Sequence, residues 1–461
     1  MSTTGLSTVL TNVNNAFSGK TSGIDVASTV DALMQIQREP EVLLQNQQSA
    51  VELRISLLGA IAADLSQVQT AVNDLTDPLG ALSQKTVTSS DSSLVTASAQ
   101  ASAAAGTHTV VISQLATVSS SYSDPIQDPT TLAGTTLTIA YGDPNNPTKT
   151  DTIALPNTIK TLQDVADAIN GSASNTGVTA SVISDANGQR LALVSKTSGA
   201  AGNLTVSGAV NFTQGVAGQD ALLTVDGVPI DSASNAVSGA IPGVDLQLSG
   251  ADKNTTVQIG ITPDTTTAAS AINNFITAYN NAMKDINTQF TTDSSGNGGP
   301  LIGDSALRTL QSQLLEIAGY APGGNGPFVN LQQMGIEMEN DGTLQMNSSV
   351  LQDALTNHYS DVQNFFQSAD SSSFGQAVTK MLTQITDPTQ GTVSSDVSGQ
   401  QAIDTDLTQQ INDFEARMTV VQQQLTDEYS QLNVLLQQYP MEMQQVGQEL
   451  GSLNPSNNNN G

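Results

Sequence analysis

The chain has 461 residues, of which 12% are charged, and its 42 acidic and 13 basic residues give a formal net charge of −29. This balance argues against nucleic acid as a partner, because phosphate binding requires clustered Lys and Arg, and it argues equally against an electrostatic membrane patch. Because cysteine is absent, the chain has no disulfide, no thiolate metal site and no cysteine nucleophile.

The first 80 residues show the periodicity of helices. Four apolar residues recur at steps of three and four and therefore share one face of a short helix: Leu6, Leu10, Val13 and Phe17. Ser18–Gly23 breaks this helix, and a second amphipathic piece follows before Pro40. Its apolar positions are Val26, Val30 and Leu33. A longer apolar stripe then runs from Val51 to Leu75.

No secretory signal peptide is visible between Met1 and Lys20, because no positively charged segment precedes an apolar run there. No stretch approaches the ~18 apolar residues of a membrane span, so membrane insertion is not expected. Export, if it occurs, must therefore use a route that does not depend on a cleaved signal.

Alternating residues rich in Val, Ile and Thr predict strands from about Lys85 to Ile261. Two hairpins are expected around the turns Asn187-Gly188 and Asp226-Gly227, because these dipeptides adopt the positive φ values of tight turns. A third hairpin is expected between 244–248 and 257–261, which alternate in the same way.

Helical periodicity also appears inside and after the strand region. A short helix is expected from Leu162 to Ile169, with Thr161 as its N-cap. After Pro263 the predicted helices cover 271–290, 305–317 and 350–366, and a small hairpin covers 336–346.

The C-terminal stripe is the strongest signal in the chain. Its spacing of three and four predicts a coiled-coil seam, formed by Leu407, Ile411, Phe414, Met418, Val421, Leu425, Tyr429, Leu432, Leu436, Tyr439, Met443, Val446 and Leu450. Pro440 lies inside the stripe and is expected to kink or end the helix, because proline lacks a backbone donor and clashes with the preceding turn. The Asn-rich tail after it is predicted to be disordered.

The order helix, sheet, helix predicts an α+β multidomain fold. The N- and C-terminal helices are expected to form a shared helical bundle or coiled-coil stalk that carries an inserted all-β head of two subdomains, because each apolar stripe must be buried and the two ends are natural partners. Two unconnected helical domains flanking a β domain are the alternative.

No residue pattern indicates catalysis, a cofactor or a metal. The only histidines, His108 and His358, are expected to be surface or packing residues rather than parts of a triad or a metal site. Gly19-Lys20-Thr21 lacks both the first glycine and the preceding strand of a phosphate-binding loop. Asp404-Thr405-Asp406 lacks the downstream Gly and Glu of a calcium loop. The protein is therefore expected not to be an enzyme.

Several motifs in order resemble one protein family. Ser22-Gly23-Ile24-Asp25, Leu33-Met34 and Glu39-Pro40 look like the N-terminal signature of the flagellar filament cap proteins, the flagellar hook-associated protein 2 family. Gly106–Ala116 resembles a Gly-Ser-Tyr…Val-x-Gln-Leu-Ala strand of that family, with His108 at a position that is usually aromatic, and Val178–Ser195 resembles a repeat shared with flagellins.

The resemblance implies a secreted structural protein at the distal tip of the bacterial flagellar filament. Such a protein would leave the cell through the flagellar type III apparatus, assemble as a ring-like homo-oligomer, retain exported flagellin and promote its folding and polymerisation. Flagellin, hook–filament junction proteins and an export chaperone bound to the C-terminal region are the implied partners. A surface adhesin whose β head binds host glycan or mucin, a junction protein and flagellin itself are the alternatives.

The expected domains follow from this reading. Flexible, filament-contacting segments cover 1–45 and 440–461, the helical stalk covers 46–80 and 264–439, the first β subdomain covers 85–122 and 218–262, and the second covers 130–210. The residues expected to contact the filament or neighbouring subunits are Leu6, Leu10, Val13, Phe17, Val26, Val30, Leu33, Leu432, Leu436, Tyr439, Met443, Val446 and Leu450.

Overall fold

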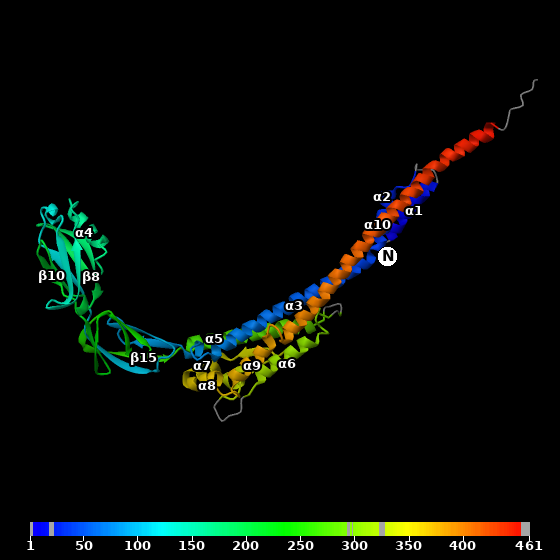
Figure 1. Ribbon diagram of the computed structural model, residues 1–461. Coiled ribbons are helices and arrows are strands. Elements are labelled where there is room, and N and C mark those ends of the chain that lie inside the picture. The colour runs from blue at the N-terminus through cyan, green and yellow to red at the C-terminus, as the bar shows by residue number, and fades with distance from the viewer. Residues whose placement is uncertain (1–2, 18–22, 293–295, 297, 322–327, 453–461) are drawn as a thin grey trace, which may run out of the picture.

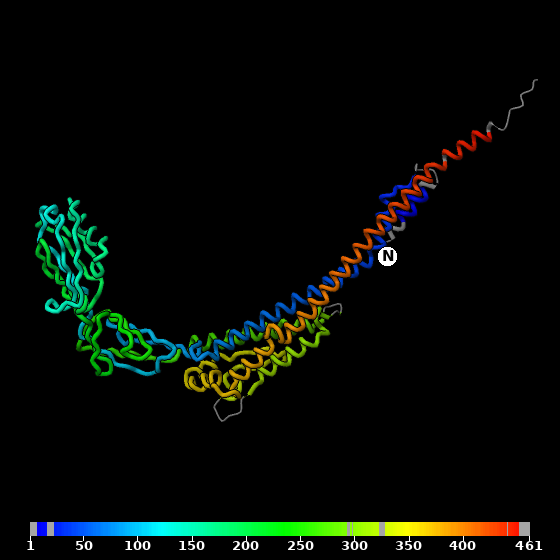
Figure 2. Tube along the Cα trace, viewed as in Figure 1, coloured from blue at the N-terminus to red at the C-terminus, as the bar shows by residue number. Residues whose placement is uncertain are grey.

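The computed structural model describes residues 3–17, 23–292, 296, 298–321 and 328–452. Figures 1 and 2 show an elongated molecule with a helical bundle in the middle, a two-part β head at one end and a long helical leg at the other. The break expected at Ser18–Ser22 and the Asn-rich tail after Ser452 lie outside the described residues.

Ten α-helices are present in the described part of the chain. They are α1 (Thr3–Phe17), α2 (Val26–Gln37), α3 (Glu39–Thr76), α4 (Leu162–Gly171), α5 (Thr265–Phe290), α6 (Ser305–Gly319), α7 (Ser348–Asn357), α8 (Tyr359–Gln367), α9 (Phe374–Thr386) and α10 (Thr392–Ser452). Local signals set several of their starts. Asp25, Asp264 and Asp304 accept backbone N–H bonds as N-caps, and Pro40 lies in the first turn of α3, where its missing donor is tolerated.

The bundle is built from both halves of the chain, as predicted. The apolar face of α3 between Leu58 and Leu75 is buried against α5, α9 and the first turns of α10, and α6 contributes to the same core. At its centre Tyr279 is fully buried and its hydroxyl donates to the carbonyl oxygen of Leu314 at 3.1 Å. The hairpin of β16 (Ile336–Met338) and β17 (Leu344–Met346) packs beside α5.

The part of the head next to the bundle contains two antiparallel sheets around one core. The first sheet, in spatial order, is β1 (Lys85–Ser89), β15 (Asp252–Pro263), β3 (Gly106–Gln114), β11 (Ala221–Val225) and β12 (Val228–Ser232). The second is β13 (Ala236–Ile241), β14 (Val244–Leu248) and β2 (Val95–Ala99).

The outer part of the head has a separate core, which α4 helps to cover. One sheet is β10 (Phe212–Val216), β4 (Val118–Ser123), β8 (Gly188–Ser198) and β7 (Val178–Asp185). The other is β6 (Asn146–Ala154), β5 (Thr136–Asp143) and β9 (Leu204–Ser207). Thr161 and Asp164 form the capping box expected at the start of α4.

Strand pairing differs from the sequence prediction at two places. The hairpins turning at 187–188 and 226–227 are present, but β14 pairs with β13 and β2, whereas β15 pairs with β1 and β3. The predicted hairpin between β14 and β15 is therefore wrong. The two strands lie in different sheets and bury their apolar faces in the same core, so they alternate alike without pairing. Residues 118–122, predicted in the first subdomain, form β4 in a sheet of the second.

Two helical predictions also need correction, and one helix was missed. The helix expected over 350–366 is interrupted at His358, which lies outside the helical region at φ −134° between α7 and α8. Helix α9 was not predicted. Pro440 does not end α10, which continues to Ser452, because one missing donor leaves the helical hydrogen bonds on both sides in place.

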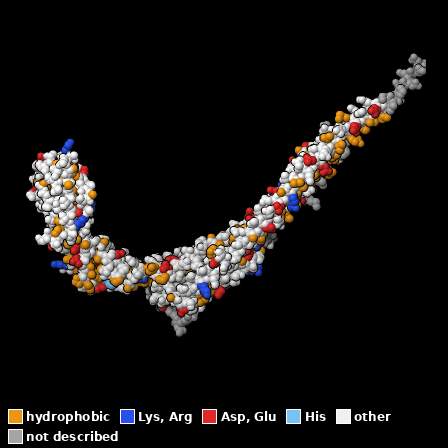
Figure 3. All heavy atoms as spheres, viewed as in Figure 1, with side chains coloured by type: hydrophobic (Ala, Val, Ile, Leu, Met, Phe, Trp, Pro, Cys, Tyr) orange, Lys and Arg blue, Asp and Glu red, His pale blue; other side chains and the backbone are white. Residues whose placement is uncertain are grey.

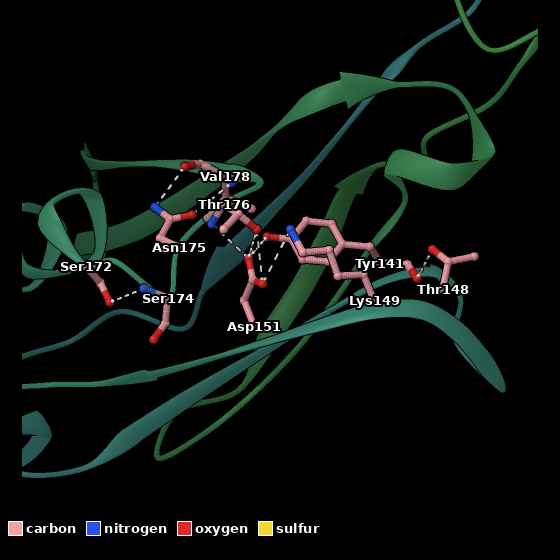
Figure 4. A network of polar contacts seen from close by, with 9 residues as sticks. All are labelled: Tyr141, Thr148, Lys149, Asp151, Ser172, Ser174, Asn175, Thr176 and Val178. Atoms are coloured by element: carbon pink, nitrogen blue, oxygen red, sulfur yellow. Dashed lines mark hydrogen bonds and ion pairs between the residues drawn. The ribbon is translucent and has the colours of Figure 1, made fainter.

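A buried carboxylate ties the outer β subdomain together (Figure 4). Asp151 on β6 accepts hydrogen bonds from the hydroxyl of Tyr141 at 2.8 Å and the backbone N–H of Thr176 at 3.0 Å, and the ammonium of Lys149 lies 3.5 Å away. Burial alone would raise the pKa of Asp151, but these donors and the charge of Lys149 hold that pKa below its usual range. Desolvation and the neighbouring carboxylate raise the pKa of Tyr141, so its hydroxyl remains a donor.

Replacing this carboxylate is expected to destabilise the outer subdomain. Asp151→Ala leaves the Tyr141 hydroxyl and the Thr176 N–H without their partner, which lowers the free energy of unfolding by about 2 kcal/mol. Since folding lowers the pKa of Asp151, its contribution is present above an unfolded pKa of ~3.9 and is lost as pH falls through the folded value. Urea unfolding at pH 7 and pH 3 measures both effects. The exposed Thr152→Ala on the same strand should change stability by less than about 0.5 kcal/mol.

Candidate interaction surface

The leg is an antiparallel pair of helices from opposite ends of the chain. Helices α2 and α3 run along α10, and the register is fixed at both ends of the paired length. The backbone N–H of Ile24 donates to Oδ1 of Asn433 at 2.9 Å, and Nε2 of Gln48 donates to Oγ1 of Thr408 at 2.7 Å. The two termini therefore form one stalk, as the sequence predicts.

A small apolar core holds the paired helices together. Val30 and Met34 on α2 are buried against Phe414 and Met418 on α10. The half-buried side chains packed around them are Val26, Val421, Leu425 and Tyr429. The C-terminal seam predicted from sequence is thus covered as far as α2 reaches.

The residues predicted to contact the filament fall into two groups. Val30 is only 3% exposed and Val26 and Leu33 are half-buried, so this group packs inside the leg rather than offering a surface. Leu10 is exposed, Val13 is half-buried, and the side chains of Leu6 and Phe17 lie outside the described residues.

The end of α10 extends beyond α2 and carries the second group. Leu432 and Leu436 are half-buried beside the start of α2. The four predicted residues that follow have exposed fractions of 49–67%: Tyr439, Met443, Val446 and Leu450. In the space-filling view, hydrophobic side chains gather along this outer part of the leg (Figure 3). We refer to Tyr439, Met443, Val446 and Leu450 as the free stripe.

Sequence analysis missed several exposed apolar side chains beside the seam. On α10 these are Val420, Val434, Leu435 and Met441, and on α3 they are Val42, Leu43 and Leu53. The sequence could have indicated them, because they are large apolar residues on predicted helices but lie outside the apolar stripes that were expected to be buried. Together with the free stripe they leave exposed apolar side chains along much of the leg.

Helix α1 folds back onto α2 through polar contacts (Figure 1). Nδ2 of Asn12 lies 2.7 Å from Oγ of Ser28 and 3.3 Å from Oγ1 of Thr29. A pocket of about 290 Å³ lies where α1, α2 and α10 meet, and amide side chains such as Asn433 line it. Gly23, at φ +156°, lets Asn433 approach closely, since a Cβ there would clash with its Oδ1.

Two carboxyl groups meet at the base of the leg. Asp304, the N-cap of α6, is 7% exposed and lies 3.5 Å from Nη2 of Arg54 on α3. Asp396 on α10 lies near Asp304, so the two carboxylates repel each other. Burial and then the neighbouring Asp304 raise the pKa of Asp396, while Gln400 and Arg54 oppose this effect.

This pair is expected to make the base of the leg more stable in mild acid. A carboxyl whose pKa is raised by folding contributes stability below its unfolded pKa and loses that contribution as pH rises through its folded pKa. Asp396→Asn removes the charge, so we expect it to raise the free energy of unfolding at pH 8 by about 1 kcal/mol and to flatten the pH dependence between pH 4 and 8. Urea unfolding of both proteins at several pH values between 4 and 8 measures this difference in the free energy of unfolding. The exposed Asp413→Asn on the same helix should reproduce the wild-type profile.

The described residues contain no group of three or more His, Cys, Asp or Glu side chains that could hold a metal ion. His108 pairs with Asp226 at 2.7 Å in the head, and His358 packs edge-on against Phe328 at 6.0 Å between ring centroids. Each histidine therefore has a close neighbour in the described part of the chain.

One segment, from Glu39 to Ser83, is long and apolar enough to cross a membrane by length and composition. In the structure these apolar residues belong to a helix of the bundle. Its apolar face, from Leu58 to Leu75, is buried in the core of the bundle.

Comparisons with known proteins agree along most of the chain. Family models described as the flagellar hook-associated protein 2 N-terminus, the flagellin hook IN motif and the flagellar hook-associated protein 2 C-terminus match residues 22–119, 136–197 and 218–440. The flagellar hook-associated protein 2 of Escherichia coli K12 is 30% identical over 368 residues, which cover 73% of this chain and 77% of the relative. The B-type flagellar hook-associated protein 2 of Pseudomonas aeruginosa is 29% identical over 68% of this chain and 72% of its own.

A solved structure extends the likeness to the fold. The crystal structure of the flagellar cap protein of Escherichia coli, which covers three of its domains, superposes with a TM-score of 0.59 at 28% identity. The match covers 75% of this chain and 99% of that one.

Proposed function

The chain belongs to the flagellar hook-associated protein 2 family and is a capping protein of the bacterial flagellar filament, and we propose that it acts there through the uncovered helical end of its leg. Its role is to retain exported flagellin at the distal tip and to promote flagellin folding and polymerisation, so that the filament elongates. The observation that carries the proposal is the free stripe, a regular row of apolar side chains on a helix that has no partner in the described part of the chain.

An apolar stripe of this kind suits helical partners. Large apolar side chains at steps of three and four pack into the groove of another amphipathic helix, and their removal from water stabilises the complex by ~1.5–3 kcal/mol per fully buried side chain. The leg carries few charges and many amides, so contact specificity comes from shape and apolar spacing rather than from ion pairs. We therefore assign the filament contacts to Leu10, Tyr439, Met443, Val446 and Leu450.

The role is structural. The family is structural, the free stripe consists of large apolar side chains, and the described residues contain no group of His, Cys, Asp or Glu that could hold a metal ion. We extend this to the stronger statement that the chain is not an enzyme. The comparisons favour neither a host-binding adhesin nor a hook–filament junction protein.

Assembly and partners follow from the same assignment. We propose that several copies form a ring-like cap, with flagellin as the direct partner of the legs and hook–filament junction proteins as earlier neighbours. The location is extracellular, on the flagellum, and we propose export through the flagellar type III apparatus with a chaperone on the C-terminal region. The exposed end of α10 supports this last point, since it offers an apolar helix face for such a chaperone.

Complementation tests the function. The chain is expressed in a flagellated bacterium that lacks its own cap gene but secretes a matched flagellin, and filament length is measured by electron microscopy. We expect long filaments in place of flagellin lost to the medium. Bald cells with undiminished flagellin in the medium would contradict the proposal.

The ring is tested separately by light scattering coupled to size exclusion, which should give a defined multiple of 47.6 kDa. A strict monomer at high concentration would contradict a preformed ring.

A further inference from the structure

Methionine is the most easily oxidised side chain in this protein. The sequence has 10 methionines, no cysteine and no tryptophan. A two-electron oxidant such as hydrogen peroxide therefore acts first on thioether sulfur, and the rate at each methionine follows the exposure of its side chain.

The methionines in the described part of the chain differ sharply in exposure. Those with exposed fractions between 0% and 8% are Met34, Met283, Met334 and Met418. Met346 and Met381 are half-buried against the core of the bundle. Among the described residues, the methionines that are more than half exposed are Met338 at 51%, Met441 at 64% and Met443 at 66%. Two of these three therefore lie on the part of α10 that extends beyond α2.

Met443 lies in the middle of the free stripe. It follows Tyr439 by four residues and precedes Val446 by three, so the three side chains share one face of α10. Met441 is only two residues away, but two helical residues are ~200° apart around the axis, which places Met441 on nearly the opposite side. Peroxide can thus reach both sulfurs, whereas only Met443 belongs to the surface assigned to the filament contact.

Oxidation makes the side chain of Met443 polar. A lone pair on Sδ attacks one oxygen of hydrogen peroxide, the S–O bond forms as the O–O bond breaks, and the departing hydroxide takes the proton of the transferred hydroxyl to give water. Sulfur loses two electrons, the peroxide gains them, and the product is methionine sulfoxide. Packing a sulfoxide against an apolar helix leaves its oxygen without a donor, so we expect association to weaken by ~10–100-fold.

We propose that Met443 is an oxidation-sensitive switch at the contact surface of the leg. The thioether completes the apolar row, and the sulfoxide interrupts that row between Tyr439 and Val446, so that the leg no longer holds its partner. The change is reversible, because methionine sulfoxide reductases restore the thioether. This inference rests on the proposed function, because it specifies how the same contact surface is regulated.

The first experiment measures which sulfurs react. The full chain is treated with increasing hydrogen peroxide and analysed by peptide mass spectrometry, and cleavage after Glu442 places Met441 and Met443 in different peptides. We expect these two residues to be oxidised at similar rates, and ~10-fold or more faster than the buried Met283 and Met334. Oxidation of Met443 no faster than that of Met283 and Met334 would overturn the switch.

The second experiment measures the consequence for capping. Purified full-length protein, oxidised at a dose that leaves Met283 and Met334 intact, is added to cells without their own cap gene, and filament length is compared with that from the same protein untreated. Oxidised wild type should lose filament growth, and treatment with both sulfoxide reductases should restore it. The double variant Met338→Leu with Met441→Leu should lose growth in the same way. Oxidised Met443→Leu should match its own untreated form.

The controls separate this inference from the proposed function. An equal loss in oxidised Met443→Leu, or no recovery of oxidised wild type after reduction, would overturn the switch and leave the capping role in place. Untreated wild-type protein that fails to cap would overturn the proposed function, and the switch with it.

Discussion

Deletion of residues 1–17 is expected to abolish capping while leaving the bundle and the β head folded. Helix α1 contributes no residue to the core of the bundle or to either core of the head, so its loss removes a contact element without opening a cavity. Filament length in a strain without its own cap gene should fall to that of uncapped cells, and far-ultraviolet circular dichroism and the midpoint of thermal unfolding should match the full chain.

Point variants in α1 give the same test without shortening the chain. Leu10→Ser should reduce filament length, because it removes an exposed apolar contact, and the exposed Asn14→Ser should leave filaments as they are. Filaments of normal length from the deletion variant would show that capping does not require α1. Loss of the thermal transition would show instead that α1 supports folding.

Gly375→Ala is expected to be the most destabilising single methyl addition in the bundle. A Cβ at Gly375 would clash with the carbonyl oxygen of Phe366 and would lie 2.8 Å from Cγ2 of Thr76. The carbonyl oxygen belongs to the backbone of α8 and cannot rotate away, so α8 and α9 must move apart. This movement would loosen the stacked rings of Phe365 and Phe374, whose centroids lie 4.7 Å apart. We expect the free energy of unfolding to fall by about 3 kcal/mol, the upper range for overpacked cores.

A second glycine in the bundle provides the matched control. Gly399 lies within α10 and has open space where a Cβ would point. Gly399→Ala should raise the free energy of unfolding by about 0.5–1 kcal/mol, because alanine is the better helix former. Urea titrations of both variants measure the contrast. Equal stability of the two variants would contradict the close contact between α8 and α9.

The success of sequence reasoning depended on whether a signal was local. The capping box at Thr161, the tight turn at Asp226-Gly227 and the periodic helices α5 and α6 were all predicted, because each is specified by neighbouring residues. The pairing of strands that are not joined by a tight turn was not predicted, because alternation fixes which face of a strand is buried but not which strand lies beside it.

The same limit applies to the contact surface. The C-terminal stripe continues with one spacing from Leu407 to Leu450, yet the structure covers its first part and exposes its last. What separates the two parts is where α2 begins, near Ile24, and that position belongs to a different segment of the chain. The break at His358 was hidden for a related reason, since the apolar spacing continues through α7 and α8.

The connections between the modules also determine the order in which the chain can fold. The head leaves and re-enters the bundle through adjacent strands, with Lys85 paired to Pro263, and the outer subdomain is inserted in the inner one at the bridge between Thr117 and Gln219. The residues that close the bundle therefore lie, in sequence, on both sides of the whole head. The residues that close the inner β subdomain likewise lie on both sides of the whole outer one. A chain that emerges N-terminus first can finish the outer β subdomain, then the inner one, and the bundle last, when α10 finally meets α3. Because closure between such distant segments is slow, we expect the bundle and the leg to become ordered after the head.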